Sequence, residues 1–584
     1  MLSNSPFKLP RKTPFGLGEH VAEWATGLSQ LDKFYAERPV GCSKERFLRY
    51  TLDVLNVDYQ VVKGDIQQIP QTGATVVVAN HPYGCVEGVI LAELLLSVRD
   101  DVQILANHYL KSVPELNELF IGVDVLSKDA AKANLLAMRS AHRHLEQGGL
   151  LLIFPAGEVS HLVDRKQRRL EDKEWSLSVS RLIKKHQAQT LPIYISGHNS
   201  TSFYLAGKIH PLLRTLMLGR ELLNKKNKPI SISLGQTIRY KELENLSDQQ
   251  MVGYLRLNTY LLNPASKIKR DKAVSDMTLQ PVAEQIPISD LQQEIDTLPN
   301  DCMMLNYNEF DVFCCHSEQI PTLMHEIGRV REENFRLVGE GTGMALDIDR
   351  FDRDYRQLFI WDREKQALVG AYRLGLVDEL MKMDGLNALY SSTLFNYEPQ
   401  FIHNMGKAVE MGRSVIAKEY QRSMAALLLL WKGIATFINR NPDYTHLFGP
   451  VSISSDYSDE ARLLLAETMS LHYYDAQQAK LVAATNPLTK PTTVNWNASL
   501  LSALADLQLL SKVIARIDDG KGVPVLLRQY LGLNGKFVSF NVDPDFNDAL
   551  DGLIVVDLRK VTDKTLGRYM GSEEAKQYLA HHGL

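Results

Sequence analysis

The chain has 584 residues, of which 45% are hydrophobic and 23% are charged, and its formal net charge is −4. This length exceeds what one hydrophobic core supports, and the composition is that of a soluble globular protein, so we expect about two to four domains. The slightly acidic balance argues against a nucleic-acid-binding protein, because binding to phosphates requires a strongly basic surface.

The N-terminal segment, residues 1–30, is basic and rich in proline, with apolar residues between the charges. Such a segment either lies on an anionic membrane surface or forms a disordered start, and the sequence favours neither. It lacks the apolar core of a signal peptide, and no apolar run in the chain reaches the ~18 residues of a transmembrane helix. The five cysteines form no CxxC pair, which favours reduced thiols and a cytoplasmic location.

The first predicted domain, residues 31–262, is organised around a strand, a turn and a helix. Thr75–Ala79 is a run of β-branched and small apolar residues that predicts a buried strand, and an apolar helix begins at Val86. His81 therefore lies in the turn and Glu87 in the first helical turn. This arrangement suits a histidine base that takes a hydroxyl proton while a carboxylate holds its other ring nitrogen. In the alternative interpretation, His81 caps the helix and Glu87 is a solvated acid that the helix dipole favours.

Two later predicted strands also end in polar loops that contain glycine. Leu150–Ser160 reads LLLIFPAGEVS, and Leu191–Ser200 reads LPIYISGHNS. An open α/β sheet builds its site where the carboxyl ends of its strands meet, so we expect these loops to join the first turn. The site residues expected from the turn and the third block are Gly84, Phe154, Pro155, Gly157, Glu158 and Ser160.

These stretches resemble the lysophosphatidic-acid-type acyltransferases, whose first block is a His followed by an acid and whose third block is Phe-Pro-Glu-Gly-x-x-Ser. Two departures resemble the branch of that family that O-acylates lyso-ornithine lipid. Glu87 stands one residue farther from His81 than the usual Asp, and Ala156 replaces the usual Glu. The resemblance implies that His81 takes the hydroxyl proton, that Glu87 holds His81, and that the loop residues shape the acceptor pocket.

A dense basic run and a linker follow this third block. The run DRKQRRLEDKEW contains Arg165, Lys166, Arg168 and Arg169. Most such runs are solvated surface, but this one adjoins the expected site, where it would suit anionic lipid headgroups or an acidic acyl carrier protein. Residues 263–287 are polar and without periodicity, which predicts a linker, so the second domain is expected at residues 288–584.

The second half opens with an acidic stretch, DIDRFDRDY, which contains Asp347, Asp349 and Asp352. An EF-hand calcium loop needs a Gly at its sixth position and a terminal Glu, and neither fits here, so no metal site is predicted. Ala408–Arg422 is followed by an apolar helix. A strand that feeds a helix in this way offers backbone N–H groups at the helix start, which suits a pyrophosphate.

This pattern resembles the N-acyltransferase superfamily that uses acetyl-CoA, the GNAT enzymes. The block Glu410-x-Gly412-Arg413-Ser414 resembles the Glu-x-x-Arg block shared by acyl-homoserine-lactone synthases and ornithine N-acyltransferases, and the aspartate run resembles their acidic block. PVLLRQY at Pro524–Tyr530 and DPDFN at Asp543–Asn547 resemble the closing signature of the ornithine N-acyltransferases. As a whole, the chain resembles the two-domain bifunctional ornithine-lipid synthases.

The resemblance implies an α/β fold with two domains, an acyltransferase-type sheet with flanking helices followed by a GNAT-like mixed sheet with helices. The second domain would transfer a 3-hydroxyacyl group from an acyl carrier protein thioester to the α-amine of ornithine. The first domain would then O-acylate the resulting lyso-ornithine lipid. Neither step requires a metal or an organic cofactor. The expected location is the cytoplasm, peripheral on the inner face of the bacterial inner membrane.

Glu410 and Arg413 are the expected catalytic residues of the second domain. Glu410 would orient or deprotonate the amine, and Arg413 would pair with Glu410 or bind the carboxylate of the amino acid. Alternatively, the two residues form a structural ion pair. Asp349 and Asp352 would meet the δ-ammonium of ornithine, or else form an acidic surface. The substrate-binding residues expected in this domain are Asp347, Asp349, Asp352, Ser414, Asp543 and Asn547.

Two other functions stay open at this stage. One domain could be catalytically dead, which would leave a membrane-surface scaffold or a regulatory binding module, although both His81/Glu87 and Glu410/Arg413 are present. The chain could also be a single-function glycerophospholipid acyltransferase with an accessory GNAT-like domain. The shifted acid and the absence of an arginine from the second block argue against that alternative. Ornithine, lysine and glutamine are all compatible head groups.

Overall fold

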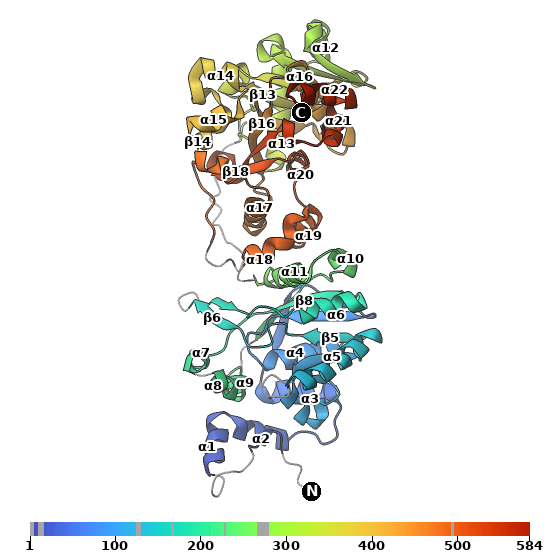
Figure 1. The fold of residues 1–584 in the computed structure, drawn as a ribbon, viewed down its shortest axis with the longest axis vertical. Helices are drawn as coiled ribbons and strands as arrows, with labels where there is room; N and C mark the ends of the chain where they lie inside the picture. Colours follow the sequence, from blue (N-terminus) through green and yellow to red (C-terminus); the bar gives the residue numbers. More distant parts are fainter. Residues whose placement is uncertain are drawn as a thin grey trace. The chain divides into compact units, whose positions relative to one another are not determined.

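The computed structural model describes residues 5–9, 17–123, 130–164, 169–209, 211–226, 229–264, 279–491, 494 and 496–584. The contacts within it divide the chain into two compact units. The first unit is Met1–Lys267 with Pro491–Leu509, and the second unit is Ile268–Lys490 with Leu510–Leu584. Each unit combines a sheet with flanking helices, which confirms the predicted two-domain α/β fold class (Figure 1).

The division at residue 267 falls inside the predicted linker, 263–287. Segment Pro491–Leu509 differs from the prediction, because the sequence placed it in a continuous second domain at 288–584, whereas its contacts group it with the first unit. The reason is a helix contact: α18 (Ala498–Leu501) packs against α11 (Asp248–Tyr260). A Cβ added to Gly253 of α11 would lie only 3.1 Å from the Ser499 carbonyl oxygen, so the two backbones approach closely.

The first unit is built on a seven-stranded sheet with the strand order β1-β9-β8-β2-β5-β3-β4. The five strands from β8 to β4 run parallel to one another, and β9 and β1 run in the opposite direction. The strands are β1 Tyr59–Lys63, β2 Thr75–Ala79, β3 Val102–Asn107, β4 Phe120–Val123, β5 Leu150–Ile153, β8 Gln189–Ile195 and β9 Ile230–Leu234.

The central strand β2 is buried along its whole length, between β5 and β8. Its Val77 and Ala79 pack with helices α3 (Lys44–Leu55) and α4 (Val86–Leu96) on one face of the sheet. On the other face, α5 (Ala130–Glu146) contacts β5, α11 contacts β8, and α6 (Ser178–His186) packs against both helices. Because helices cover both faces, a site in this unit must lie where the strands end.

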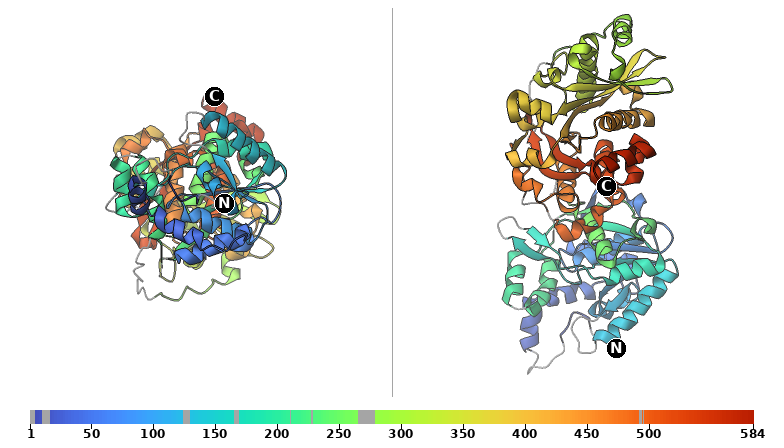
Figure 2. Two further views of the ribbon diagram at one scale, coloured as in Figure 1. Left: turned by 90° about the horizontal axis from the view of Figure 1, so that it is seen from below. Right: turned by 45° about the horizontal axis from the view of Figure 1, so that its top comes forward.

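Smaller elements complete the first unit. The views in Figures 1 and 2 show the blue helix α1 and the green helices α7 and α8 at the same end of this unit. These elements are α1 Leu17–Ala25, α2 Leu28–Ala36, α7 Thr201–Ile209, α8 Pro211–Leu216, α9 Leu218–Leu223, α10 Tyr240–Leu243, and the hairpin of β6 His161–Asp164 and β7 Arg169–Glu171.

The second unit is built on an eight-stranded sheet with the order β10-β11-β12-β13-β15-β16-β19-β18. Neighbouring strands are antiparallel, except for the parallel pair β15 and β16. The strands are β10 Met303–Tyr307, β11 Phe310–His316, β12 Arg356–Asp362, β13 Ala367–Leu376, β15 Ala408–Ile416, β16 His446–Ile453, β18 Lys536–Asp543 and β19 Ala549–Asp557, and a small sheet pairs β14 Phe395–Tyr397 with β17 Val482–Ala484.

Helices surround this sheet (Figure 1). They are α12 Ile288–Asp296, α13 Pro321–Leu337, α14 Val377–Asp384, α15 Pro399–Met405, α16 Met424–Arg440, α17 Asp459–His472, α20 Val525–Gly532, α21 Asp563–Met570 and α22 Ser572–His581. Helix α19, Leu507–Ile517, begins in the first unit and continues into the second from Leu510. Within the part of the chain that the structure describes, no single helix has the length and apolar content of a membrane span, although the bent pair Ala498–Ala505 and Leu507–Ile517 does by length and composition.

The parallel pair β15 and β16 opens along its length. Ala408–Glu410 pairs with His446–Phe448, but β15 continues to Ile416 and β16 to Ile453 without further pairing between the two. Gly449 stands where the strands separate, and a Cβ on it would contact the Met411 carbonyl oxygen. Only glycine allows this close approach, which fixes the place where the opening begins.

We expect Gly449→Ala to lower the free energy of unfolding of the second unit by about 1–3 kcal/mol, because the added Cβ overpacks against backbone that cannot move away. Denaturant unfolding monitored by fluorescence measures this change. Gly412→Ala on β15 is the control, because its Cβ would have its nearest neighbour 3.9 Å away. Equal stability of the two variants would contradict the expectation.

Candidate active sites

The structure brings His81 and Glu87 together. The turn between β2 and α4 leads His81 back over the start of the helix, and its Nδ1 lies 3.0 Å from Oε1 of Glu87. The same carboxylate oxygen accepts hydrogen bonds from the backbone N–H groups of Tyr83, at 2.8 Å, and Gly84, at 2.7 Å. The ring Nδ1 of His81 is close to this oxygen but does not meet the angular criteria of a hydrogen bond, so the contact is chiefly electrostatic.

Glu87 is fully buried, with no exposed surface. Burial alone would raise the pKa of this carboxyl, but the neighbouring His81 and the backbone donor of Gly84 outweigh it, and the pKa lies below its usual value. The carboxylate is therefore ionised at neutral pH and can fix the orientation and the tautomer of the imidazole.

The Nε2 side of the His81 ring is partly open to solvent. The ring lies against Phe154 of the third block, with 4.4 Å between the ring centroids. Its side chain is 16% exposed, and the described residues provide no hydrogen-bond partner for Nε2. An imidazole held through Nδ1, with Nε2 open, can take a proton from an acceptor hydroxyl.

Asp172 ties the third block to the first and was missed by sequence reasoning. Its carboxylate accepts hydrogen bonds from the Ser160 hydroxyl at 2.6 Å, the backbone N–H of His81 at 3.3 Å and the Trp175 indole at 3.0 Å. Ser160 in turn donates its backbone N–H to the His81 carbonyl at 2.9 Å. Asp172 lies in a charged run with no motif of its own, and the neighbouring Trp175 was the sole hint that this acid is buried.

The remaining predicted residues of the first site lie in its loops. Gly84 and Gly157 adopt positive φ angles of 97° and 67°, which lets the chain turn sharply in both loops. Pro155 accepts a hydrogen bond from the Ser176 N–H at 2.9 Å. Arg165, Lys166, Arg168 and the side chain of Arg169, the basic run of the sequence analysis, lie outside the described residues.

Glu158 contacts two cations, Lys173 at 2.9 Å and Arg214 of α8 at 2.7 Å. Burial would raise its pKa, but these partners outweigh burial and lower it, so the carboxylate stays charged. The interaction fastens α8 to the third block. The predicted contact of Glu158 with substrate stays a prediction, and the structure adds two protein partners for its carboxylate.

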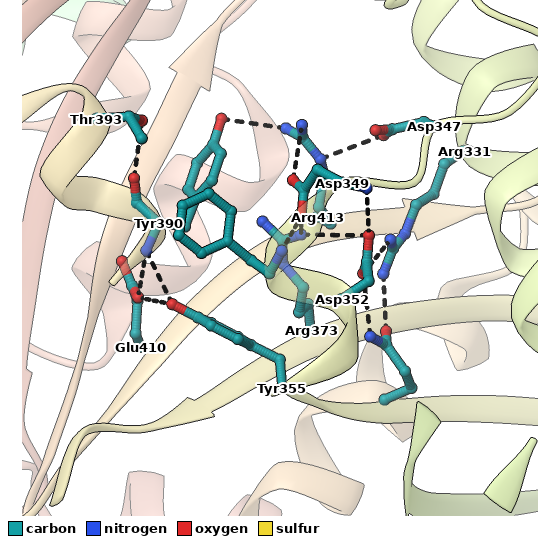
Figure 3. A network of polar contacts seen from close by, with 12 residues as sticks. Arg331, Asp347, Asp349, Asp352, Tyr355, Arg373, Tyr390, Thr393, Glu410 and Arg413 are labelled. Carbon is teal, nitrogen blue, oxygen red and sulfur yellow. Dashed lines mark hydrogen bonds and ion pairs between the residues drawn. The ribbon is translucent and has the colours of Figure 1, made fainter. Parts of the chain in front are cut away.

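In the second unit, Glu410 organises a turn (Figure 3). It is 1% exposed and accepts hydrogen bonds from the Tyr355 hydroxyl and from the N–H groups of Tyr390, at 3.1 Å, and Ser391, at 2.7 Å. Both carboxylate oxygens are thus occupied, which holds the turn Tyr390–Thr393 against β15. The role of Glu410 as a proton acceptor stays a prediction, and the geometry gives it a structural task.

Arg413 does not pair with Glu410, so the expected ion pair is corrected. A β-bulge in β15 accompanies the left-handed conformation of Arg413, whose φ is 49°. The guanidinium instead lies 3.2 Å from Asp347, 3.5 Å from Asp349 and 3.2 Å from the Tyr390 hydroxyl. A non-glycine residue in this conformation stores strain, which is typical of functional sites.

The predicted acidic site for an ammonium group is also corrected at Asp352. This residue is 2% exposed and lies 2.8 Å from Arg331 and 3.4 Å from Arg373 (Figure 3). Burial opposes its ionisation, but the two arginines outweigh burial and lower the pKa of Asp352 to about 2. Asp349 likewise contacts Arg373, at 2.6 Å. The aspartate run is therefore neutralised from within the protein.

A second group of acids, Glu340, Asp543 and Asp551, lies near enough to Arg413 for its charge to act on their carboxyls. Asp551 of β19 is 3% exposed and accepts a hydrogen bond from Ser452 of β16 at 2.6 Å. The Arg413 guanidinium lies 4.8 Å from the ring centroid of Phe546, in the turn that follows Asp543. Glu340 belongs to the same group, because its charge and that of Asp543 act on the Asp551 carboxyl.

Two of these acids titrate near neutral pH. Burial raises the pKa of Asp551 to about 7, and the charges of Asp543 and Glu340 act in the same direction. Burial also raises the pKa of Glu340 to about 7, with Asp456 and Asp543 adding to it and Arg413 opposing. Groups with such pKa values can exchange protons at neutral pH. Sequence reasoning found Asp543 but missed Glu340 and Asp551, because no motif marks either one.

Two predicted residues lie at the margins of this site. Asn547 adopts φ of 53° and donates its side-chain N–H to the Ser455 hydroxyl at 2.8 Å. Ser414 lies against the hydroxyl of the buried Tyr372. Both contacts position backbone near the opening without reaching the acids.

The sequence profile described as an acyltransferase matches residues 42–268, and the profile described as an acetyltransferase (GNAT) domain matches residues 330–432. The first range contains His81 and Glu87, and the second contains Glu410 and Arg413.

This chain is an acyltransferase. It joins an N-terminal acyltransferase domain to a C-terminal GNAT domain, as the sequence predicted. The chain is 26% identical over 310 residues to a glycine N(alpha)-acyltransferase of Phocaeicola vulgatus, an alignment that covers 50% of this chain and 92% of that protein. A glycine N(alpha)-acyltransferase of Bacteroides thetaiotaomicron is 26% identical over 294 residues, covering 48% and 85% respectively. A lyso-glycine lipid O-acyltransferase of Phocaeicola vulgatus is 26% identical over 209 residues, covering 34% of this acyltransferase and 70% of that protein.

We expect His81→Ala to reduce acyl transfer by the N-terminal domain by about 10²–10⁴-fold, because the acceptor hydroxyl then keeps its proton. Transfer to a hydroxylated acceptor, followed by mass spectrometry, measures the loss. His198→Ala is the control, since the ring of that exposed histidine contacts the neighbouring Asn199 carbonyl, and its backbone contact with Lys225 survives the substitution. Comparable activity of the two variants would rule out His81 as the base.

Proposed function

We propose that this acyltransferase is bifunctional and makes a diacylated amino acid lipid. The C-terminal domain N-acylates the α-amine of ornithine with a 3-hydroxyacyl group carried by acyl carrier protein. The N-terminal domain then O-acylates the hydroxyl of the resulting lyso-ornithine lipid. The protein works at the inner face of the bacterial inner membrane, where its lipid product accumulates.

The observation that carries this proposal is the presence of both acyltransferase types in one chain. The relatives in Phocaeicola vulgatus are two separately named proteins, one for N-acylation of an amino acid and one for O-acylation of a lyso-lipid. The two reactions fit in sequence, because the hydroxyl of an N-(3-hydroxyacyl) amino acid is the acceptor that the second reaction needs.

The N-acyl transfer requires a neutral amine. Its nitrogen attacks the thioester carbonyl carbon, the C–S bond breaks, and the thiolate leaves. Asp551 or Glu340 accepts the amine proton, since both are half ionised near pH 7, and the proton then passes to the thiolate. Beyond Glu410 and Phe448 the described parts of β15 and β16 do not pair with each other, and such an opening suits the amides of the extended arm that carries the thioester.

The O-acyl transfer uses the His81–Glu87 pair. Nε2 of His81 takes the hydroxyl proton, the oxygen attacks the thioester carbonyl, and the proton then passes to the departing thiolate. Glu87, 3.0 Å from Nδ1, stabilises the imidazolium that forms in between. The loop of Phe154, Gly157 and Ser160 shapes the acceptor pocket.

The head group has two candidates. Glu340, Asp543 and Asp551 place several carboxyls near Arg413, and this excess of acids favours an amino acid with a cationic side chain, such as ornithine. Glycine is the second candidate, because the relatives are named for it. Arg413 would bind the substrate carboxylate in either case.

Expression in a host without aminolipids tests the proposal. We expect a phosphorus-free lipid with two acyl chains, whose head-group mass distinguishes ornithine from glycine in the mass spectrum of total lipids. With His81→Ala, the singly acylated lyso-lipid should accumulate instead. If phospholipids alone change, the chain is a glycerophospholipid acyltransferase and the proposal fails.

We expect Asp551→Asn to lower the rate of N-acylation by about 10²-fold or more and to remove the rise in rate that the wild type shows through about pH 7. Burial raises the pKa of Asp551 to about 7 in the folded chain, above its value in the unfolded chain. The free energy of unfolding therefore falls as the pH rises from the ordinary pKa of an aspartate to about 7. The variant should therefore unfold at an equal or higher temperature at pH 8.

Asp545→Asn is the matched control, because it removes an exposed carboxylate from the adjacent turn. An unchanged pH profile in Asp551→Asn would show that another group takes the proton, with Glu340 the next to test.

A further inference from the structure

Helix α1 presents its apolar side chains to solvent and its acids to the protein. Leu17, Val21 and Trp24 are 65%, 65% and 78% exposed, whereas Glu19 and Glu23 are 8% and 4% exposed. The three apolar residues are spaced four and three apart and so share one helical face. A helix on the surface of a soluble domain has the opposite arrangement, with its apolar face on the core.

Helices α7 and α8 continue this pattern. Leu205 and Ile209 of α7 are 46% and 78% exposed, and Leu213 of α8 is 42% exposed. The inner side of α7 is nevertheless well packed, since Phe203 and Tyr204 are buried against Val159. The outward apolar residues are therefore additional to a complete core and serve something outside it.

The helices at this end of the first unit are connected. Helix α1 contacts α2, α2 contacts α9, and α8 contacts both α7 and α9. The same helices lie together in both ribbon views (Figures 1 and 2). We call Leu17, Val21 and Trp24 of α1 with Leu205, Ile209 and Leu213 of α7 and α8 the outward face.

Around the outward face, the acids that the structure describes are buried and an arginine is exposed. The carboxylates on α1 and α7–α9 are Glu19, Glu23 and Glu221, and each is 8% exposed or less. Arg220 of α9 is exposed. Among the described residues, these four helices thus expose apolar side chains and cationic charge without an exposed carboxylate, which complements an anionic lipid surface.

The outward face adjoins the His81 site. A Cβ on Gly84, in the His81 turn, would lie 2.6 Å from the Leu218 side chain of α9. Arg214 of α8 contacts Glu158 of the third block at 2.7 Å. Helices α7, α8 and α9 therefore pack against the acceptor loops, and α7 and α8 carry part of the outward face next to them.

We propose that the outward face docks this acyltransferase on an anionic lipid bilayer, with α1 lying in the interface and α7 and α8 bringing the His81 site to the lipid surface. The inference deepens the proposed function, because a lyso-lipid acceptor then reaches His81 without crossing water. Aliphatic side chains enter the acyl boundary, Trp24 occupies the headgroup level, and Arg220 meets anionic headgroups.

Trp24 provides a direct measurement. The chain has five tryptophans, and Trp24 alone is exposed, because Trp175, Trp361, Trp431 and Trp496 are each 7% exposed or less. We expect the fluorescence of the full chain to shift to shorter wavelength on vesicles of phosphatidylethanolamine and phosphatidylglycerol, and to be quenched by brominated acyl chains. Vesicles of phosphatidylcholine alone should give a weaker response.

Val21→Asp should weaken vesicle binding about tenfold or more, because it puts a carboxylate on the outward face. Val525→Asp is the matched control, since Val525 also lies on a helix and is 59% exposed. Thermal unfolding checks that both variants fold, and sedimentation with vesicles measures binding without the fluorescence of Trp24. Equal binding by the two variants, or binding with no shift of Trp24, would overturn the proposal.

These outcomes are separate from those of the proposed function, because the vesicles contain no acyl donor or amino acid lipid. Vesicle binding through Trp24 in a chain that makes no aminolipid would leave the docking surface standing and reject the lipid product. If the chain makes the aminolipid but Val21→Asp binds vesicles as the wild type does, the lipid product stands and the docking surface is rejected.

Discussion

A buried glutamate that accepts hydrogen bonds from two successive backbone N–H groups is the interaction on which both sites depend. Glu87 accepts from Tyr83 and Gly84, and Glu410 accepts from Tyr390 and Ser391. An ionised carboxylate is costly to bury unless donors surround it. The turn must therefore wrap around the acid, and the side chains carried by that turn are fixed as a result.

The turns around the two glutamates carry different side chains. Around Glu87, the turn carries His81, whose ring is held on one nitrogen and open on the other. Around Glu410, the turn carries Tyr390, whose hydroxyl contacts Arg413 3.2 Å away. The same interaction thus fixes His81 in one domain and the tyrosine that contacts Arg413 in the other.

The sequence predicted those features that depend on neighbours in the chain. His81 and Glu87 were recognisable because a buried strand, a turn and an apolar helix follow one another within a few residues. Asp172 was not, since it meets His81 only after the chain has made five further strands. The expected Glu410–Arg413 pair failed because residues three apart on a strand point to opposite faces, and because each group has other partners: backbone N–H groups for Glu410, aspartates for Arg413. Glu340 and Asp551 come from opposite ends of the second domain, and only the folded sheet brings their charges together.

Because Pro491–Leu509 belongs to the first unit, that unit can be completed only late in the synthesis of the chain. Synthesis proceeds from the N-terminus, and domains generally fold as they emerge. In this acyltransferase the partner of α11 is made only after most of the GNAT domain has been translated. The domain that begins first is therefore completed late, and during that interval the surface of α11 that α18 covers is open to chaperones and to wrong partners.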